Sequence, residues 1–208
     1  MTGRFITLEG GEGAGKSTQL RALAMALRAR GLEVVETREP GGSEGAEAIR
    51  TLLLTGSADR WSSRAEALLF AAARADHVEK IIRPALARGA WVLSDRFLDS
   101  SRAYQGGADG LADADILALH RIGSEGLLPD RTLVLIAPQA VVEARLAARD
   151  GNHSDRIGGR AVNFHRSVAG SFQRFAAQEP ERMRMIDASG GITDVTDRLL
   201  AQLNDLLQ

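Results

Sequence analysis

The sequence contains no cysteine, and this absence excludes a disulfide framework, thiol catalysis and a metal site built on thiolates. Aromatic residues make up only 4% of the chain, so its core must consist mainly of Leu, Ile, Val and Ala. The net charge is −1, and such a chain lacks the basic excess typical of proteins that bind nucleic acid nonspecifically. We therefore expect no nucleic-acid partner.

Long hydrophobic runs are also missing, because no apolar stretch approaches the length that spans a bilayer. Residues 1–4 lead directly into an apolar strand pattern, which leaves no room for a charged leader and an apolar signal segment. The four histidines show no spacing typical of a metal site. These features predict a cytoplasmic protein without a membrane partner.

Apolar runs of strand length alternate with segments of helical periodicity along the chain. Strands are predicted at 5–9, 33–37, 90–94, 132–136 and 183–186, and helices at 17–30, 44–54, 63–87, 141–149, 161–178 and 195–207. Strands separated by helices of this length indicate βαβ units. We therefore predict a single α/β domain over residues 1–208, with three layers and a five-stranded parallel sheet flanked by helices.

Two polar, glycine-rich segments interrupt this alternation, at 105–110 and 150–160. The second lies between two predicted helices and is rich in arginine. We interpret residues 149–160 as a short mobile lid and not as a linker, because the chain after it is too short for an independent domain.

Residues 10–17, Gly-Gly-Glu-Gly-Ala-Gly-Lys-Ser, match the pattern G-x-x-x-x-G-K-[ST] in full. A predicted strand precedes the segment and a predicted helix follows it, so an accidental lysine in a glycine-rich turn is a poor alternative. Glycines allow successive N–H groups to point inward at a helix N-terminus, where phosphate binds well. The segment predicts a phosphate-binding loop for ATP in a P-loop NTPase fold.

Each part of this loop has an expected task. Lys16 is expected to reach the β- and γ-phosphates, and the Ser17 hydroxyl is expected to ligate Mg²⁺. Asp95, at the end of the third predicted strand, is a second candidate for Mg²⁺ or for orienting the acceptor phosphate. The predicted ATP-binding residues are Gly10, Gly11, Glu12, Gly13, Ala14, Gly15, Lys16, Ser17 and Thr18.

A phosphate loop alone does not separate kinases from other P-loop proteins. A GTPase normally carries an N-K-x-D sequence, which is absent here, and Lys80 is the only lysine besides Lys16. Large ATPases usually carry an apolar strand that ends in paired carboxylates, whereas the nearest strand here ends in Ser94-Asp95-Arg96. Elimination favours a kinase.

Arg38 and Arg96 follow the second and third predicted strands. The carboxyl ends of parallel strands line the ligand crevice of such sheets, and the arginine fork matches phosphate oxygens. Each arginine alone is equally well explained by a surface ion pair. Together, beside a phosphate loop, they predict a clamp for an acceptor that already carries a phosphate.

Several blocks of sequence resemble those of the bacterial thymidylate kinases, in the same order and spacing. They are residues 9–18, Thr-Arg-Glu-Pro-Gly-Gly at 37–42, Leu-Phe-Ala-Ala-Ala-Arg at 69–74, Asp-Arg-Phe at 95–97 and Asp-Ser-Ser-Arg-Ala-Tyr-Gln-Gly at 99–106. The resemblance implies a kinase that transfers the γ-phosphate of ATP to dTMP with Mg²⁺. It also implies a homodimer.

The resemblance also implies how the acceptor is held. Phe70 would stack on the thymine ring and Arg74 would hydrogen-bond its edge, although a lone Phe in an apolar run is otherwise a core residue. Their spacing of four places both on one helix face. Ser101 falls where the family contacts the base edge. Glu12 falls where an acidic residue reaches the sugar 3′-hydroxyl, and Tyr104 and Gln105 fall around the base and deoxyribose.

The phosphate loop carries no cation besides Lys16, whereas some members of the family place an arginine there. We therefore expect a lid arginine to stabilise the transferred phosphate, from Arg149, Arg156 or Arg160. Asp155-Arg156-Ile157 matches the lid motif of the bacterial subgroup, which makes Arg156 the first candidate for a catalytic role. For Arg160 a solvated polar loop is an equal alternative.

Three departures from the family pattern concern the fourth strand, the residue after Arg96 and the lid. The fourth strand lacks the aspartate that often follows it, Phe97 replaces a Tyr or His, and Gly158-Gly159 stand where acidic residues are frequent. Two alternatives stay open: a kinase acting on a nucleoside or another monophosphate, and a nucleotide-binding switch that no longer turns over.

Overall fold

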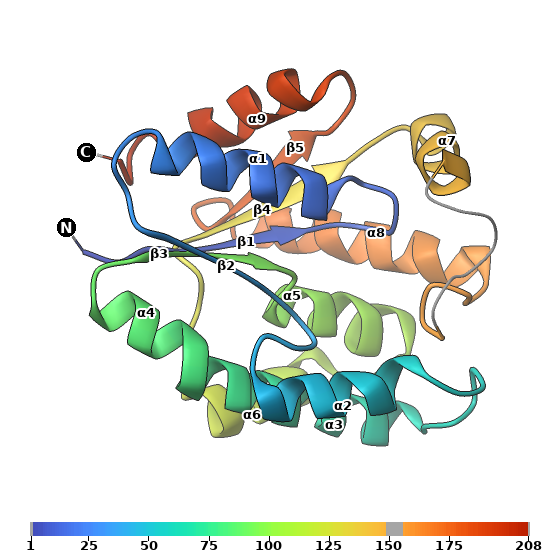
Figure 1. Ribbon diagram of the computed structural model, residues 1–208. Coiled ribbons are helices and arrows are strands. Elements are labelled where there is room, and N and C mark those ends of the chain that lie inside the picture. Colours follow the sequence, from blue (N-terminus) through green and yellow to red (C-terminus); the bar gives the residue numbers. More distant parts are fainter. Residues whose placement is uncertain (1, 149–155, 208) are drawn as a thin grey trace.

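The computed structural model describes residues 2–148 and 156–207, which contain a five-stranded sheet (Figure 1). All strand pairs are parallel, and the spatial order is β2-β3-β1-β4-β5. The predicted parallel sheet is confirmed, and no strand bound is shifted by more than one residue. The strands are β1 (Phe5–Glu9), β2 (Val34–Arg38), β3 (Trp91–Asp95), β4 (Arg131–Ile136) and β5 (Met183–Asp187).

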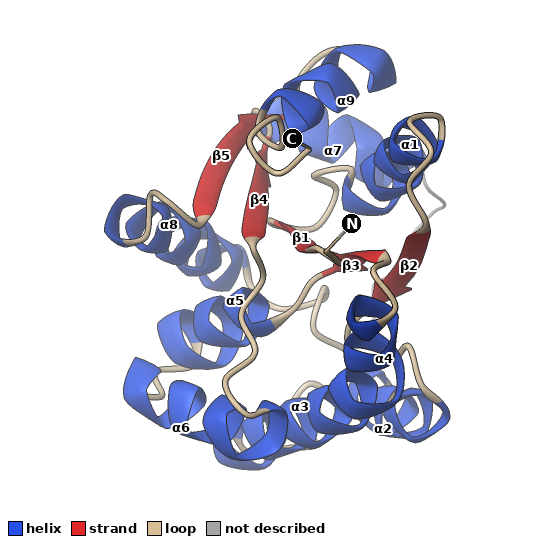
Figure 2. Cartoon of the chain, turned by 90° about the vertical axis from the view of Figure 1, so that its left-hand side faces the viewer, coloured by secondary structure: helices blue, strands red, loops and turns tan. Residues whose placement is uncertain are grey.

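Helices cover both faces of this sheet, as Figure 2 shows with α1 and α9 on one face and α3, α4, α6 and α8 on the other. They are α1 (Lys16–Arg28), α2 (Glu44–Leu54), α3 (Ser63–His77), η1 (Val78–Ile82), α4 (Arg83–Ala87), α5 (Leu98–Ser101), η2 (Arg102–Ala108), α6 (Asp113–Ser124), α7 (Gln139–Ala148), α8 (Val162–Gln178) and α9 (Ile192–Ala201). The sequence patterns do not predict α6.

Alternation along the strands divides the core between the two faces. On β4, Leu133 and Leu135 pack with α1 and α9, whereas Val134 points to the opposite face and packs with α8. On β1, Phe5 meets Phe97 edge to face at 4.8 Å between ring centroids. Because successive side chains of a strand point to opposite faces, every central strand is buried on both sides.

The predicted helix over 63–87 is correct in its bounds but wrong in being one regular α-helix. It is divided into α3, a π-helical turn η1 and α4, which has a proline in its first turn. Pro84 has no N–H to donate and its ring clashes with the carbonyl four residues earlier, so a regular α-helix cannot pass through it.

The predicted interruption at 105–110 is also wrong, because most of it belongs to η2, which continues α5. The glycines there serve packing. A Cβ on Gly107 would collide with Ser171 of α8, so only glycine lets η2 approach that helix. Sequence alone reads such glycines as loop residues because their tertiary partner is distant in the chain.

The predicted lid is described only in its second part. Residues 149–155, with Arg149, lie outside the described residues, so its mobility stays a prediction. Residues 156–160 are described, and Arg156 donates from its backbone N–H to Leu54 O at 3.4 Å. Among the helices that the structure describes, none combines the length and apolar character of a membrane span.

Candidate active site

The loop between β1 and α1 has the backbone of an anion cradle. Gly10, Gly13 and Gly15 have positive φ angles, and a Cβ on Gly10 would lie 2.5 Å from Leu135 O of β4. Glycine is therefore required where the loop crosses the sheet. Helix α1 begins at Lys16, so the unpaired N–H groups of its first turn are available to a phosphate.

Lys16 folds back over this loop. Its Nζ donates to Gly10 O at 3.1 Å and to Gly11 O at 2.8 Å. Burial, followed by repulsion from Arg96, lowers the pKa of Lys16 to about 8. A triphosphate beside the ammonium would favour its charged form.

Ser17 and Asp95, the two predicted Mg²⁺ residues, lie together. Ser17 Oγ donates to Asp95 Oδ2 at 2.6 Å. Asp95 ends β3, which is paired with β1 beneath the loop. Among the described residues no group of three or more His, Cys, Asp or Glu could hold a metal. Hydroxyl and carboxylate oxygens suit Mg²⁺, which completes its six ligands with phosphate oxygens and waters.

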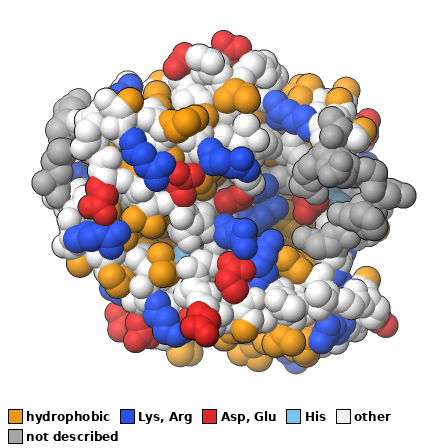
Figure 3. Space-filling view, in the orientation of Figure 1, with side chains coloured by type: hydrophobic (Ala, Val, Ile, Leu, Met, Phe, Trp, Pro, Cys, Tyr) orange, Lys and Arg blue, Asp and Glu red, His pale blue; other side chains and the backbone are white. Residues whose placement is uncertain are grey.

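A cleft that is open to solvent extends from the phosphate loop between α3 and η2. Basic and acidic side chains meet near the middle of the face drawn in Figure 3, which is the orientation of Figure 1. The cleft collects most of the predicted acceptor residues: Glu12, Phe70, Arg74, Arg96, Ser101, Tyr104 and Gln105. The Tyr104 hydroxyl is buried and has no hydrogen-bond partner among the described residues.

Arg74 is fixed in the wall of this cleft. Its Nε donates to Glu39 Oε2 at 2.8 Å, and Nη2 donates to Ser101 Oγ at 2.8 Å and to Phe97 O at 3.2 Å. Glu39 is also hydrogen-bonded to His77 Nδ1 at 3.0 Å. The structure thus brings together Arg74 and Ser101, the two residues that are predicted to contact the edge of the base. Sequence reasoning missed Glu39 and His77, although Glu39 lies within the Thr-Arg-Glu-Pro-Gly-Gly block.

The predicted clamp of Arg38 and Arg96 is brought together only in part. Arg96 lines the cleft, and its Nη1 donates to Gly10 O at 3.2 Å and to Ser100 Oγ at 3.1 Å. Arg38 is exposed and donates to both carboxylate oxygens of Glu47 at 3.1 Å, and it does not line the cleft. Arg50, which sequence reasoning missed, lines the cleft in its place.

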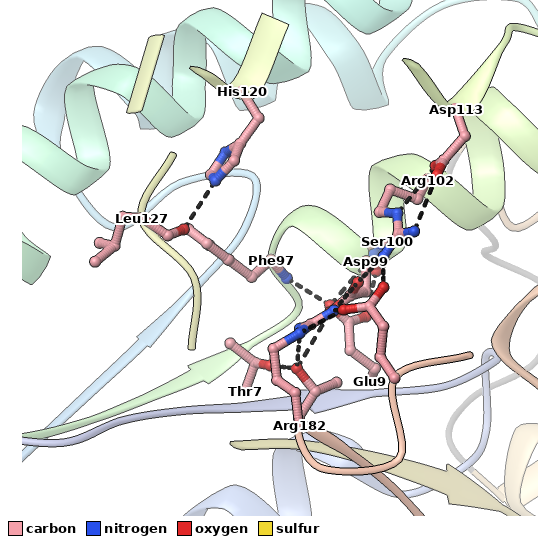
Figure 4. A network of polar contacts seen from close by, with 12 residues as sticks. Thr7, Glu9, Phe97, Asp99, Ser100, Arg102, Asp113, His120, Leu127 and Arg182 are labelled. Atoms are coloured by element: carbon pink, nitrogen blue, oxygen red, sulfur yellow. Dashed lines mark hydrogen bonds and ion pairs between the residues drawn. The ribbon is translucent and has the colours of Figure 1, made fainter. Parts of the chain in front are cut away.

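The buried carboxylate of Glu9, which sequence reasoning missed, fixes the turn that carries Arg96. Glu9 accepts hydrogen bonds from Phe97 N at 2.8 Å, Ser100 N at 3.2 Å and Ser100 Oγ at 2.6 Å (Figure 4). Burial, followed by repulsion from Asp99, raises the pKa of Glu9 to about 7. Arg96 itself has a φ of 72°, which is unusual for a side chain this large and is typical of functional sites.

Asp99 belongs to the same network and anchors the helix that follows Arg96. It is fully buried and receives two hydrogen bonds from Arg182, at 2.6 and 2.9 Å, and one from Arg102 at 3.1 Å. Figure 4 shows these side chains gathered beside Ser100. Because the carboxylate is fully paired, α5 is firmly attached to the start of β5.

The structure does not bring Arg156 to the phosphate loop. Its side chain is fully buried and donates to Leu53 O at 2.7 Å, to Ala58 O at 3.2 Å and to Glu66. Arg160 pairs with Glu66 at 2.7 Å and with Asp109 at 2.8 Å. The lid motif gave no sign of these partners, because they lie in α2, α3 and η2 or just beyond them.

Arg145 of α7, missed by sequence reasoning, contacts the phosphate loop. Its Nη1 donates to Ala14 O at 3.1 Å and its Nη2 donates to Ala188 O at 2.9 Å. A Cβ on Gly15 would lie 3.3 Å from Nη1 of Arg145. The guanidinium thus joins the phosphate loop to the chain after β5. The sequence signal that could have found Arg145 is its position four residues before Arg149, which was itself predicted as a lid cation.

The sequence is similar to thymidylate kinases over nearly its whole length, and the family model described as thymidylate kinase matches residues 8–199. The chain is 66% identical over 207 residues to the thymidylate kinase of Rhizorhabdus wittichii, covering 100% of both. It is 52% identical over 202 residues to that of Rhodopseudomonas palustris, covering 96% of this chain and 87% of the relative. The crystal structure of thymidylate kinase from Ehrlichia chaffeensis matches with a TM-score of 0.78 and 31% identity, covering 98% of this chain and 99% of that one.

Proposed function

The chain belongs to the thymidylate kinase family, and we propose on this premise that its phosphate loop and the adjoining cleft hold the two nucleotides of the reaction. The chain is a P-loop kinase that transfers the γ-phosphate of ATP to dTMP and gives dTDP and ADP. Its site residues divide into an ATP side and an acceptor side, which meet at the Gly10 carbonyl that both Lys16 and Arg96 contact.

On the ATP side, the N–H groups of residues 10–17 and the Lys16 ammonium receive the β- and γ-phosphates. Ser17 and Asp95, already joined at 2.6 Å, would hold Mg²⁺, which would neutralise charge on the phosphate oxygens. Arg145 supplies a further cation at the loop. With the segment 188–191 it would flank the adenine.

On the acceptor side, Phe70 stacks on thymine while Arg74 and Ser101 bind the base edge. Arg96 lines this pocket and also contacts Gly10 O, so it lies between the pocket and the phosphate loop. There it binds the acceptor phosphate. Glu12 binds the sugar 3′-hydroxyl. Tyr104 and Gln105 enclose the sugar and base.

Catalysis in this arrangement consists of positioning and charge neutralisation, because phosphoryl transfer needs little covalent work from the protein. Lys16 and Arg96 both contact Gly10 O, where the ATP side and the acceptor side meet. Arg156 is committed to buried partners, so we assign it an anchoring role in place of the predicted catalytic one. Arg149 stays a predicted lid cation.

The observation that carries this proposal is the single cleft that joins the phosphate loop to Phe70, Arg74 and Ser101. A coupled assay of ADP release, with each nucleoside monophosphate supplied in turn, tests it. We expect turnover to depend on dTMP. Phe70→Ala should raise the KM for dTMP roughly tenfold or more, because an aromatic stack on a base is worth about 1–3 kcal/mol, and leave the KM for ATP within about twofold. An unchanged KM for dTMP would place the acceptor elsewhere.

We further propose a homodimer formed through α3 and α6, which carry the exposed apolar side chains Leu68, Leu117 and Ile122. The two helices pack closely, since a Cβ on Gly123 would lie 3.3 Å from Ala75 Cβ. These three side chains would form the apolar part of the interface. The cytoplasmic location and the absence of nucleic-acid and membrane partners stay predictions.

A further inference from the structure

Glu66, near the start of α3, is a fully buried carboxylate outside the cleft. Its Oε1 accepts a hydrogen bond from Gln105 Nε2 at 2.8 Å. Its Oε2 pairs with Arg156 and, at 2.7 Å, with Arg160. One side chain of α3 thus joins η2 to the segment 156–160, although the three lie far apart in the sequence.

The charges of this cluster balance. Arg160 also pairs with Asp109 at 2.8 Å, so two carboxylates face two guanidinium groups. Burying a carboxylate is costly unless it is paired, and removing one partner of a buried pair leaves an uncompensated charge. Glu66 is therefore the group that allows Arg156 to be buried here and Arg160 to be half-buried.

Both segments that Glu66 connects, η2 and residues 156–160, contribute to the cleft wall. Gln105 lines it directly. Ile157, next to Arg156, also lines it and packs in the same apolar cluster as Phe70 and Tyr104. Arg156 further binds Leu53 O, beside the cleft residue Leu54. Three parts of the cleft wall, from α2, η2 and the segment after 155, are thereby held to one carboxylate that cannot itself touch a ligand in the cleft.

We propose that Glu66 is a positioning residue for the acceptor nucleotide: its carboxylate fixes Gln105 and Ile157 in the wall of the dTMP pocket. This inference rests on the proposed assignment of the cleft to dTMP. The partners of Glu66 lie in η2 and the segment 156–160 and not in the phosphate loop, so the effect is confined to the acceptor side. The pocket wall is built around the Glu66–Arg156–Arg160 cluster, and the pocket loosens when the Glu66 carboxylate no longer holds Gln105 and Arg156.

The test is steady-state kinetics with both substrates and calorimetric titration with dTMP on Glu66→Gln, which keeps the shape of the side chain and removes its charge. We expect the KM and Kd for dTMP to rise about tenfold, as the loss of a charge-assisted hydrogen bond implies, while the KM for ATP stays within about twofold. Asp109→Asn is the matched control: it makes the same chemical change on the other carboxylate bound to Arg160 but leaves Glu66 bound to Gln105 and Arg156, so it should change neither KM by more than about twofold.

The double variant Glu66→Gln/Arg160→Gln restores the charge balance and should recover part of the dTMP affinity, leaving a KM about threefold above wild type. If Glu66→Gln does not fold, the double variant takes its place in the kinetic test. A wild-type KM for dTMP in either folded variant, or equal changes in the KM for dTMP and ATP, would overturn the inference, because a purely structural role lowers the melting temperature without this asymmetry. Failure of the proposed function is separate: it appears as a wild-type KM for dTMP in Phe70→Ala.

Discussion

At the scale of single residues, His120 is a histidine that the fold keeps neutral. It lies buried on α6, hydrogen-bonded through Nε2 to Leu127 O at 2.8 Å and edge-on to Phe97. Burial, followed by repulsion from Arg74, lowers the pKa of His120 to about 4. Between pH 6.5 and pH 4 the unfolded chain therefore binds a proton that the native chain does not, and stability falls as the pH falls.

We predict that His120→Gln, which can replace the hydrogen bond without titrating, removes this loss. Relative to the variant, the wild type should lose up to about 3 kcal/mol of its free energy of unfolding between about pH 7 and pH 4. Urea denaturation at several pH values measures the difference. The raised pKa of Glu9 acts in the opposite direction but is shared by both proteins, so it cancels. Parallel pH profiles would contradict the assignment.

Arg156 provides a sharper test, since sequence and structure give it different tasks. A lid cation on the transferred phosphate implies that Arg156→Ala lowers kcat roughly a thousandfold with dTMP binding unchanged. Its buried contacts with Glu66 and Leu53 O imply otherwise. We expect a loss of about 3 kcal/mol in stability, a raised KM for dTMP and a kcat reduced by less than about tenfold. Kinetics and thermal denaturation of the variant decide between the two.

At the scale of elements, the close approach of η2 to α8 depends on Gly107. A Cβ there meets the Ser171 side chain, so Gly107→Ala should destabilise the protein by about 1–3 kcal/mol through overpacking. Adding Ser171→Gly makes room for the methyl group, and the double variant should regain part of the loss beyond the sum of the two single effects. Additive changes in the free energy of unfolding would mean that the two helices do not meet at these residues.

Elements differ in how far the sequence predicts them. The strands follow from local apolar runs, so 5–9 and 91–95 are found almost to the residue. The phosphate loop can also be predicted from a local pattern, since its glycines and Lys16 lie within eight residues and Lys16 donates to the carbonyls of Gly10 and Gly11. The functions of Glu66 and Arg145 depend on partners in distant segments, which no local pattern contains. The same holds for the buried contacts of Arg156: its motif indicates an arginine near a lid but does not show that its partner is Glu66.

At the scale of the whole molecule, the exposed apolar side chains differ in their surroundings. Leu68, Leu117 and Ile122 belong to two helices packed against each other, whereas Met25 stands on α1, on the opposite face of the sheet (Figure 1). Isolated exposed apolar residues are common on monomers, but apolar residues shared between two packed helices suit a self-complementary interface. A two-fold dimer would bury each of them twice.

We therefore predict that Ile122→Glu converts a dimer into a monomer. Ile122 is 77% exposed in the single chain, so the substitution costs the folded protomer little, whereas a carboxylate buried at a two-fold interface would meet its own copy. Met25, 64% exposed, offers the matched control: Met25→Glu adds the same charge on the other face and should leave the mass of the assembly unchanged.

Sedimentation equilibrium of the wild type and the two variants measures the outcome. A wild type that sediments as a monomer, or a dimer that survives Ile122→Glu, would remove α6 from the interface. Because Ile122 does not line the acceptor cleft, we expect the monomer to keep its KM for dTMP if each protomer binds its substrates independently.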